Sequence, residues 1–305
     1  MSVQTQQVGQ RPVMDEVPVR AAGIHVSLIL NRRHRVARLV DFLAGSFPQK
    51  AAAIDTVARR EGIERVYTLV EKEESVGWSR VGYAREGSIP GYYKRSDAHL
   101  MGRVVSTPPL VDEDGLPMTL PADANAAERM LNQAKKLQPE LTGALKGFKV
   151  ALCSDESVEA EAALPPRSKK GGAWLDERFG RTGQRLHIIG RVARVGAKPA
   201  EQLLSLELQE PFGNAHLQLA TWAQKPDEGR LLFCALQAAS EPLRAKEIGC
   251  VFALSPADNP VTAAAFLAAG YKRTGLLSRH LQLGDRRVDA LLWTRRTVTA
   301  DADAA

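Results

Sequence analysis

Residues 250–275 read CVFALSPADNPVTAAAFLAAGYKRTG, and the order of elements in this stretch decides the fold that the sequence predicts. An apolar strand is expected at 250–254, and an alanine-rich helix is expected at 260–269, where Gly270 ends it. A further strand is expected from Tyr271 onward. A strand, a helix and a second strand in this order predict a protein of the α/β class.

The first half of the chain contains a similar unit. A strand rich in β-branched residues is expected at 63–70 (IERVYTLV), a short helix follows, and GYAREG at 82–87 then matches GYKRTG at 270–275. A glycine that ends a helix explains Gly82 and Gly270 by itself. It does not explain the tyrosine, the arginine and the second glycine that the two stretches share. We call the shared six-residue pattern the GYxRxG motif. We therefore favour a duplicated strand–helix–strand unit.

The chain of 305 residues is long enough for two compact domains. Residues 106–123 hold four prolines and four acidic residues, a composition typical of a linker. The expected organisation is a flexible tail at 1–21, an N-terminal unit at 22–105, this linker, a C-terminal unit at 124–297 and a tail at 298–305.

Hydrophobic spacing predicts the other elements. In the N-terminal unit we expect a strand at 24–30, a helical pattern at 36–43, a helix at 49–60, a short helix at 76–81 and two short strands within 82–101. In the C-terminal unit we expect helices at 124–137 and 230–239, and strands at 186–195, 203–208, 216–222, 271–281 and 287–294.

The formal charge of +6 and the pI near 9.3 raise the question of a nucleic-acid partner. Aromatic residues make up only 6% of the chain, so stacking platforms are scarce, and the basic residues form short clusters rather than a long stripe. These clusters are Arg32, Arg33 and Arg35; Arg167, Lys169 and Lys170; and Arg295 and Arg296. A basic solvated surface is the favoured interpretation, and an anionic ligand such as a cofactor phosphate is the next.

No apolar run approaches the roughly 20 residues that a membrane helix needs, and the first twenty residues lack the apolar region of a secretory signal. We therefore expect a cytoplasmic protein without a membrane partner. Three cysteines without a CxxC spacing, and scattered histidines, predict no metal site. Whether two chains form a homodimer is left open.

The pattern N-x(6)-F-x(3)-G-Y, carried by Asn259, Phe266, Gly270 and Tyr271, follows the strand–helix–strand order. It resembles the C-terminal part of the GNAT acetyltransferase fold. Over 24–101 and 184–295 the chain is also similar to the beta-lysine N-acetyltransferase family. The residues that match this family are Asn31 to Arg33, Asp41, Phe42, Gly45, 61–70, 82–101 and Gly270 to Trp293. The resemblance implies tandem GNAT-like units in an α/β (or α+β) fold, of which the N-terminal one is truncated or degenerate.

The resemblance implies transfer of an acetyl group from acetyl-CoA, as co-substrate, to a primary amine of a small lysine-like metabolite. Such chemistry needs backbone N–H groups at the start of a helix to hold a pyrophosphate. It also needs a proton acceptor for the amine and a donor for the oxyanion and the leaving thiolate.

Three groups of residues are candidates for these roles. The expected cofactor contacts are Gln224, Lys225, Gly229, Arg230, Asn259 and Phe266. The catalytic candidate is Tyr271, whose alternative role is that of a half-buried aromatic residue. The expected substrate contacts are Arg85, Glu86, Tyr92, Tyr93 and Asp97, for which a well-bonded surface hairpin is the alternative interpretation.

The cofactor loop departs from the family pattern, which has a further glycine or alanine. Residues 223–230 contain a single glycine, Gly229, and Pro226 lacks an N–H donor. The carboxylates of Asp227 and Glu228 would repel a phosphate if they faced it. An ordinary polar turn before a helix explains this loop as well. A catalytically inactive GNAT-like protein that binds a partner or a ligand is therefore the alternative function.

Overall fold

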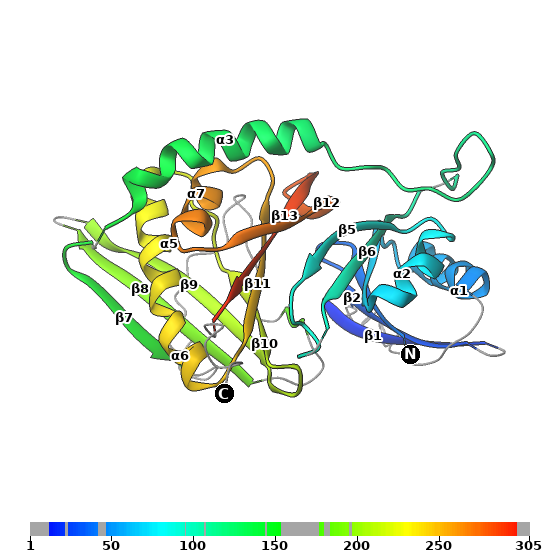
Figure 1. Cartoon of the computed structure of the whole chain (residues 1–305), viewed down its shortest axis with the longest axis horizontal. Helices are drawn as coiled ribbons and strands as arrows, with labels where there is room; N and C mark the ends of the chain where they lie inside the picture. Colours follow the sequence, from blue (N-terminus) through cyan, green and yellow to red (C-terminus); the bar gives the residue numbers. More distant parts are fainter. Residues whose placement is uncertain are drawn as a thin grey trace, which may run out of the picture.

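One continuous mixed β-sheet runs through the whole protein in the computed structural model (Figure 1). The structure describes residues 12–21, 24–41, 47–94, 96–106, 108–143, 145–153, 177–179, 184–194 and 197–297. Within these residues the sheet has 13 strands. The α/β class predicted from the sequence is confirmed.

The first half holds six strands of this sheet and two helices. They are β1 (Met14–Ala21), β2 (Ile24–Asn31), β3 (Val36–Asp41), α1 (Phe47–Arg60), β4 (Arg65–Val70), α2 (Lys72–Ser79), β5 (Ala84–Ile89) and β6 (Ala98–Val104). The strand order is β1-β2-β3-β4-β6-β5, and β3 and β4 are parallel while the other pairs in this half are antiparallel. Because α1 connects β3 to β4, this half is built around a βαβ crossover.

The second half repeats this order. Its elements are α3 (Ala124–Leu141), β7 (Phe148–Cys153), β8 (Gln184–Arg194), β9 (Ala197–Gln209), the 3₁₀ helix η1 (Glu210–Phe212), β10 (Asn214–Leu219), α5 (Pro226–Ala238), α6 (Ser240–Ala245), β11 (Cys250–Pro256), α7 (Pro260–Ala268), β12 (Lys272–Leu283) and β13 (Arg286–Arg296). The strand order is β7-β8-β9-β10-β11-β13-β12, with β10 and β11 parallel on either side of the crossover through α5. The order of strand, helix, strand, helix and two closing strands is therefore the one expected from the sequence.

Two expectations for the first half were wrong. Residues 14–21 form β1, which pairs with β2 along its whole length, so this part of the expected N-terminal tail belongs to the sheet. Residues 36–41 form β3 rather than a helix, because pairing with β2 and β4 decides the conformation of a short apolar run. Ala37 and Leu39 face the α1 side, whereas Val36 and Arg38 face the other side of the sheet. Phe42 and Gly45 of the family pattern, and the cluster of Arg167, Lys169 and Lys170, lie outside the described residues.

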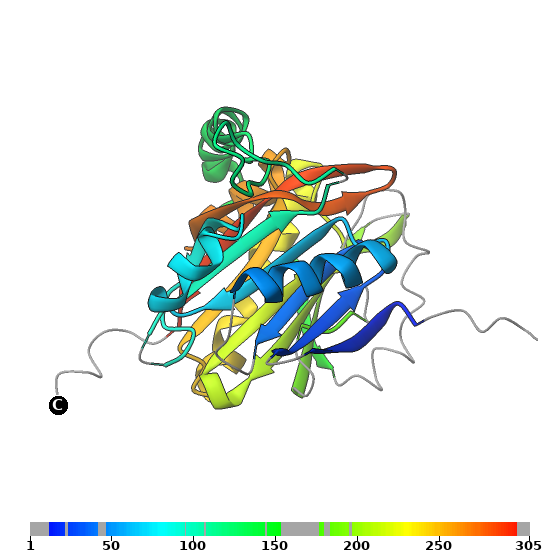
Figure 2. The same ribbon diagram turned by 90° about the vertical axis from the view of Figure 1, so that its right-hand side faces the viewer.

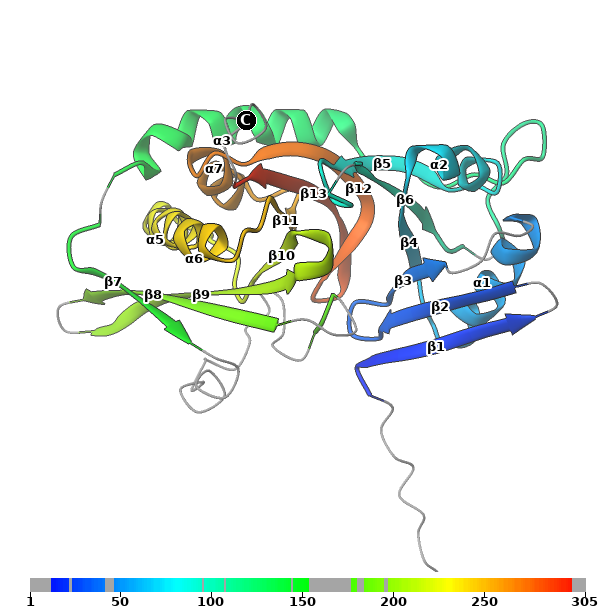
Figure 3. The same ribbon diagram turned by 60° about the horizontal axis from the view of Figure 1, so that its bottom comes forward.

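Three large apolar cores of the described residues hold this arrangement together. In the first half, α1 lies across the strands and packs on them through Ile54 and Ala58 (Figure 2). In the second half, α5 and α7 lie between the sheet and the long helix α3 (Figure 3). A third core, with Ile89, Phe252 and Leu292, joins the inner faces of the two halves. The helices of each half therefore cover an outer face, and the inner faces are turned toward each other.

The two halves meet where the second glycines of the two GYxRxG motifs pair. Gly87 of β5 lies directly opposite Gly275 of β12, in an antiparallel bridge. A Cβ atom on Gly87 would lie 2.8 Å from the Cα atom of Gly275, and a Cβ atom on Gly275 would lie 2.7 Å from the carbonyl oxygen of Glu86. Each motif also contains a register shift before its second glycine, between Arg85 and Gly87 and between Arg273 and Gly275. Only glycine permits backbones to approach so closely, which explains the second glycine of the motif.

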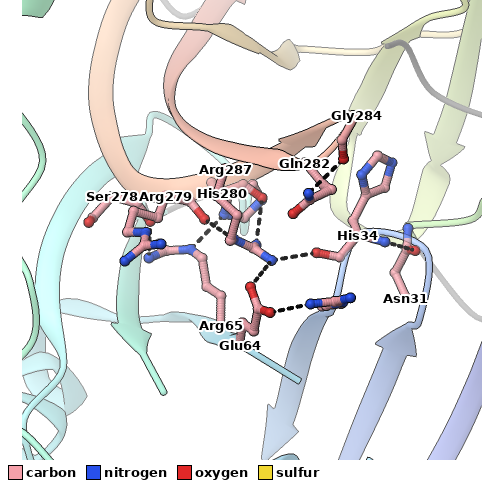
Figure 4. Close-up of polar contacts among 11 residues, drawn as sticks. Asn31, His34, Glu64, Arg65, Ser278, Arg279, His280, Gln282, Gly284 and Arg287 are labelled. Carbon is pink, nitrogen blue, oxygen red and sulfur yellow. Dashed lines mark hydrogen bonds and ion pairs between the residues drawn. The ribbon is translucent and has the colours of Figure 1, made fainter. Parts of the chain in front are cut away.

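A buried ion pair between Arg65 and Glu86 reinforces this junction, and Figure 4 shows Arg65 beside Ser278 and His280. Arg65 of β4 is 0% exposed and reaches into the second half, where its Nη1 donates to the carbonyl oxygen of Ser278 at 2.6 Å. Its Nη2 pairs with Glu86, whose Oε1 accepts a hydrogen bond from the backbone N–H of Ser278 at 3.0 Å. Arg287 makes a second crossing and donates to the carbonyl oxygen of His34 at 2.8 Å. Removing one partner from such a network would leave an uncompensated buried charge.

We expect Gly87→Ala and Gly275→Ala each to destabilise the protein by about 1–3 kcal/mol, because the new methyl group meets main-chain atoms that cannot move aside. Urea unfolding followed by circular dichroism measures the change. Gly284→Ala is the control, since a Cβ atom there meets nothing within 4 Å, although its φ of +60° adds local strain. Equal stability of Gly87→Ala and the wild type would contradict a tight junction.

Candidate functional site

A cavity of about 140 Å³ lies between the inner faces of the two halves. Its walls come from β2, β3 and β4 in the first half and from β10, β11 and β12 in the second half, so neither half forms it alone. Most of the lining is apolar or aromatic. The polar and charged residues that line it are Asn31, His34, Arg38, Tyr67, Glu177, Arg178, His216, Gln218, Trp222, His280 and Gln282.

Arg38 of β3 brings a guanidinium group to the cavity wall. Its guanidinium carbon lies 4.1 Å from the centre of the Phe179 ring, a cation–π contact that fixes its position. Among the described residues, no carboxylate forms an ion pair with Arg38, and its Nε is buried without a hydrogen-bond partner. Burial raises the pKa of the neighbouring Tyr92 phenol to about 12, and the Arg38 charge opposes that shift. The side chain therefore brings a positive charge to the cavity.

Two buried histidines line the same cavity. Burial lowers the pKa of His216 to about 3, and the Arg38 and Arg185 charges act in the same direction. Its ring stacks on Phe252 with centroids 4.9 Å apart, and its Nδ1 has no hydrogen-bond partner. Burial also lowers the pKa of His280, whose Nδ1 accepts a hydrogen bond from Nε of Arg65 at 2.9 Å. Both imidazoles are therefore neutral at neutral pH, and His280 carries its proton on Nε2.

The carboxylate in the cavity wall is already neutralised. Glu177 accepts hydrogen bonds from Asn31 at 3.0 Å and from Arg33 at 2.6 Å, and His34 lies 3.2 Å away. Burial would raise the pKa of Glu177, but His34 and Arg33 together outweigh it and lower that pKa. Residues 32–35 form the turn between β2 and β3, so this basic cluster is not at the start of a helix.

The cavity reaches the point where the two parallel strands of the second half separate. The pairing of β10 with β11 ends at Leu217 and Ala253, although the strands continue to Leu219 and Pro256. Leu219 and Leu254, which lie beyond the last pair, line the cavity. In α/β sheets, ligands bind at the carboxyl ends of parallel strands, next to the start of the connecting helix.

Glu228 occupies two backbone donors immediately before that helix. Its Oε2 accepts hydrogen bonds from the N–H groups of Gln224 at 2.7 Å and Lys225 at 3.3 Å. The N–H group of Gly229 donates within the helix, to the carbonyl oxygen of Lys225 at 2.9 Å. A side-chain carboxylate thus holds two donors beside the helix start and places a negative charge there, so a pyrophosphate does not fit unless the Glu228 side chain moves.

Three of the other expected cofactor contacts, Gly229, Asn259 and Phe266, have a structural role. A Cβ atom on Gly229 would lie 2.8 Å from Val261, so this glycine permits α5 to pack against α7. The side chain of Asn259 caps α7 by accepting from the N–H of Thr262 at 2.9 Å. Phe266 is buried and stacks on Trp293 with centroids 5.3 Å apart. Nε of Arg230 is buried without a hydrogen-bond partner. Their expected role in cofactor binding stays a prediction.

Tyr271, the catalytic candidate, lies in the core on the helix side of the sheet. It is 3% exposed and packs edge-on against Phe266, with ring centroids 5.1 Å apart. Burial raises the pKa of its phenol, so the hydroxyl stays protonated at neutral pH. A proton donor must be protonated, but the cavity lining within the described residues does not include this tyrosine.

The five expected substrate contacts are not brought together on the cavity wall formed by the described residues. Arg85 is exposed, and Glu86 pairs with Arg65 at the junction. Tyr92 lies in the central core, close to Arg38, while the hydroxyl of Tyr93 donates to the carbonyl oxygen of Leu69 at 3.0 Å. Asp97 accepts from the N–H of Gly91 at 2.8 Å, within the β5–β6 connection.

The sequence interpretation missed the residues that do line the cavity. Arg38 stands alone as a charge in the apolar run VARLV, and His216 alternates with apolar residues in HLQL. A single charged or polar residue on the inward side of a strand was the available signal. The described residues contain no cluster of metal-ligating side chains and no helix long and apolar enough to span a membrane.

The chain matches no family model and none of the curated proteins. Among solved structures it is similar to the ribosomal-protein-S18-alanine N-acetyltransferase from Escherichia coli, with 14% identity and a TM-score of 0.37 over 50% of this chain and 96% of that one. It is also similar to a spermidine N-acetyltransferase from Vibrio cholerae in complex with CoA and spermine, with 11% identity and a TM-score of 0.39 over 50% of this chain and 97% of that one. Both are N-acetyltransferases, whereas the finer resemblance to beta-lysine N-acetyltransferases stays a prediction.

We expect the protein to lose stability as the pH falls below about 6.5, the usual pKa of histidine in an unfolded chain. His216 and His280 have lowered pKa values in the folded state, so the unfolded state binds more protons in this range. Each can cost up to about 1.4 kcal/mol per pH unit. Urea midpoints measured at pH 7.5, 6.5 and 5.5 test this, and His216→Phe should flatten the dependence. A midpoint that rises toward pH 5.5 would contradict it.

Proposed function

We propose that this protein is a GNAT-type N-acetyltransferase that transfers an acetyl group from acetyl-CoA to a primary amine of a small, lysine-like metabolite. The supporting observation is the cavity between the halves, which reaches the separated ends of β10 and β11 beside the start of α5. This position allows an acceptor on the inner face of the sheet to meet a cofactor that approaches from the helix side. The strand order of the second half supports the same function.

We also propose that the chain consists of an N-terminal unit, predicted at 22–105 and extended to residue 14 by β1, and a C-terminal unit at 124–297, derived from one duplicated ancestor. The shared strand order, the matched register shifts and the paired glycines of the two GYxRxG motifs support this division. The cavity then belongs to both units, although only the second unit carries the helix start that we assign to the cofactor.

One observation favours a second function, that of a catalytically inactive GNAT-like protein that binds a ligand or a partner. Glu228 caps α5 with the hydrogen bonds that a pyrophosphate would need, and Asp227 adds a second negative charge in the same turn. Acetyl-CoA must displace the Glu228 carboxylate if the first function is right. In the second function the cap is permanent and only the cavity binds a ligand.

Calorimetric titration with acetyl-CoA distinguishes the two functions. We expect wild-type protein to bind weakly and Glu228→Ala to bind about 3–10-fold more tightly, because that change frees two N–H donors and removes a negative charge. Glu228→Gln removes only the charge and should bind with intermediate affinity. Glu241→Gln, in the first turn of α6, is the charge-matched control and should behave like the wild type.

No binding of acetyl-CoA at millimolar concentration by the wild type and by both Glu228 variants would exclude the acetyltransferase and favour the ligand-binding function. Tighter binding by Glu228→Ala, together with acetylation of a small amine, would support the enzyme.

A further inference from the structure

We propose that Arg38 binds the carboxylate group of a small ligand in the central cavity, and that the apolar walls hold the ligand's carbon chain. This inference rests on the proposed function in one respect, because it assigns a carboxylate to the amine acceptor. The binding site itself requires no acetyl transfer. Its parts come from both halves, since Arg38 lies on β3 and the facing residues lie on β10, β11 and β12.

The charge of the cavity favours an anionic group. Arg38 has no carboxylate partner among the described residues, and its buried Nε lacks a hydrogen-bond acceptor. Glu177, in the same wall, is held by Asn31, Arg33 and His34, so it does not neutralise Arg38. A guanidinium binds a carboxylate through two parallel hydrogen bonds, and such charge-assisted bonds are strong in a low-dielectric site.

The surroundings of Arg38 keep its guanidinium in place before a ligand arrives. The guanidinium carbon lies over the Phe179 ring, and the phenol of Tyr92 is close by. Phe179 is itself fixed, because its backbone N–H donates to Glu207 at 2.7 Å and its ring packs on Phe252 with centroids 5.1 Å apart. A side chain that is already ordered loses little conformational entropy on binding.

The size and the lining of the cavity limit the rest of the ligand. One water molecule needs roughly 10–15 Å³ of cavity volume. The cavity of about 140 Å³ therefore accommodates a molecule of about ten non-hydrogen atoms. Ile29, Leu69 and Leu281 provide apolar surface for a short carbon chain. Gln218 and Gln282 lie on the same cavity wall, and side-chain amides can accept a hydrogen bond from an amine. A ligand with a carboxylate at one end and an amine at the other meets these conditions.

A simple polyamine does not meet them. It carries only positive charges, and Arg38 and Arg178 both lie on the cavity wall. The carboxylate that could attract a polyamine, Glu177, is already occupied by Asn31, Arg33 and His34. The cavity therefore selects for a carboxylate and against a diamine of the same length.

Calorimetric titration of the full-length protein with three matched probes tests this inference. L-lysine carries both groups, cadaverine lacks the carboxylate, and 6-aminohexanoate lacks the α-amine. We expect lysine and 6-aminohexanoate to bind at least about 10-fold more tightly than cadaverine. Arg38→Gln should weaken the binding of lysine and 6-aminohexanoate by about 10–100-fold and leave the affinity for cadaverine unchanged. Arg38→Lys should retain part of the affinity for the two carboxylates.

Arg20→Gln is the matched control, because it removes the same charge from an exposed position on β1 and should leave all three affinities unchanged. Thermal unfolding of each variant checks that it is folded, and Arg38→Lys serves in place of Arg38→Gln if the latter does not fold. Cadaverine binding as tightly as lysine, no binding of either carboxylate, or carboxylate affinity that survives both Arg38 substitutions would overturn the inference.

The outcome is separable from that of the acetyl-CoA titration. Carboxylate binding at Arg38 without any binding of acetyl-CoA would exclude the acetyltransferase function and support the ligand site. Binding of acetyl-CoA without carboxylate binding would overturn the proposed carboxylate site and still support the acetyltransferase function.

Discussion

The contact between Gly87 and Gly275 is the constraint on which the rest of the structure depends. Two edge strands from different halves approach until there is no room for a Cβ atom on either residue, and the two half-sheets become one. This contact turns the helix-free faces toward each other, and the third apolar core fills the space near the junction. The central cavity exists because both inner faces are needed to enclose it.

Arg65 connects this junction to the cavity. It is fully buried, pairs with Glu86 beside Gly87, and donates to Nδ1 of His280 on the cavity wall. The hydrogen bond fixes the tautomer of His280, and burial keeps that imidazole neutral. The Arg65 side chain therefore holds the halves together and determines which ring nitrogen of His280 carries the proton. Figure 4 shows Arg65 reaching from the first half toward Ser278 and His280.

The start of α5 shows a competition between stability and binding. A carboxylate that caps a helix and a phosphate bound at a helix start use the same N–H groups and the same end of the helix dipole. Glu228 accepts hydrogen bonds from the N–H groups of Gln224 and Lys225 beside this helix start. Gly229, which in the sequence resembles the remnant of a phosphate loop, is required by the packing of α5 against Val261.

Sequence patterns by themselves determined the α/β class, most of the helices and strands, and the importance of the GYxRxG motif, because these depend on local spacing and on residues with restricted backbone conformations. They failed for β3, where pairing with two neighbouring strands overrides a helical spacing of apolar residues. They also could not identify Arg38, His216 and Phe179 as neighbours, because these residues are distant in the chain and meet only after the two half-sheets join. The reason for the second glycine of the motif was likewise decided by tertiary structure, since a main-chain contact between two equivalent glycines leaves no periodic pattern in the sequence.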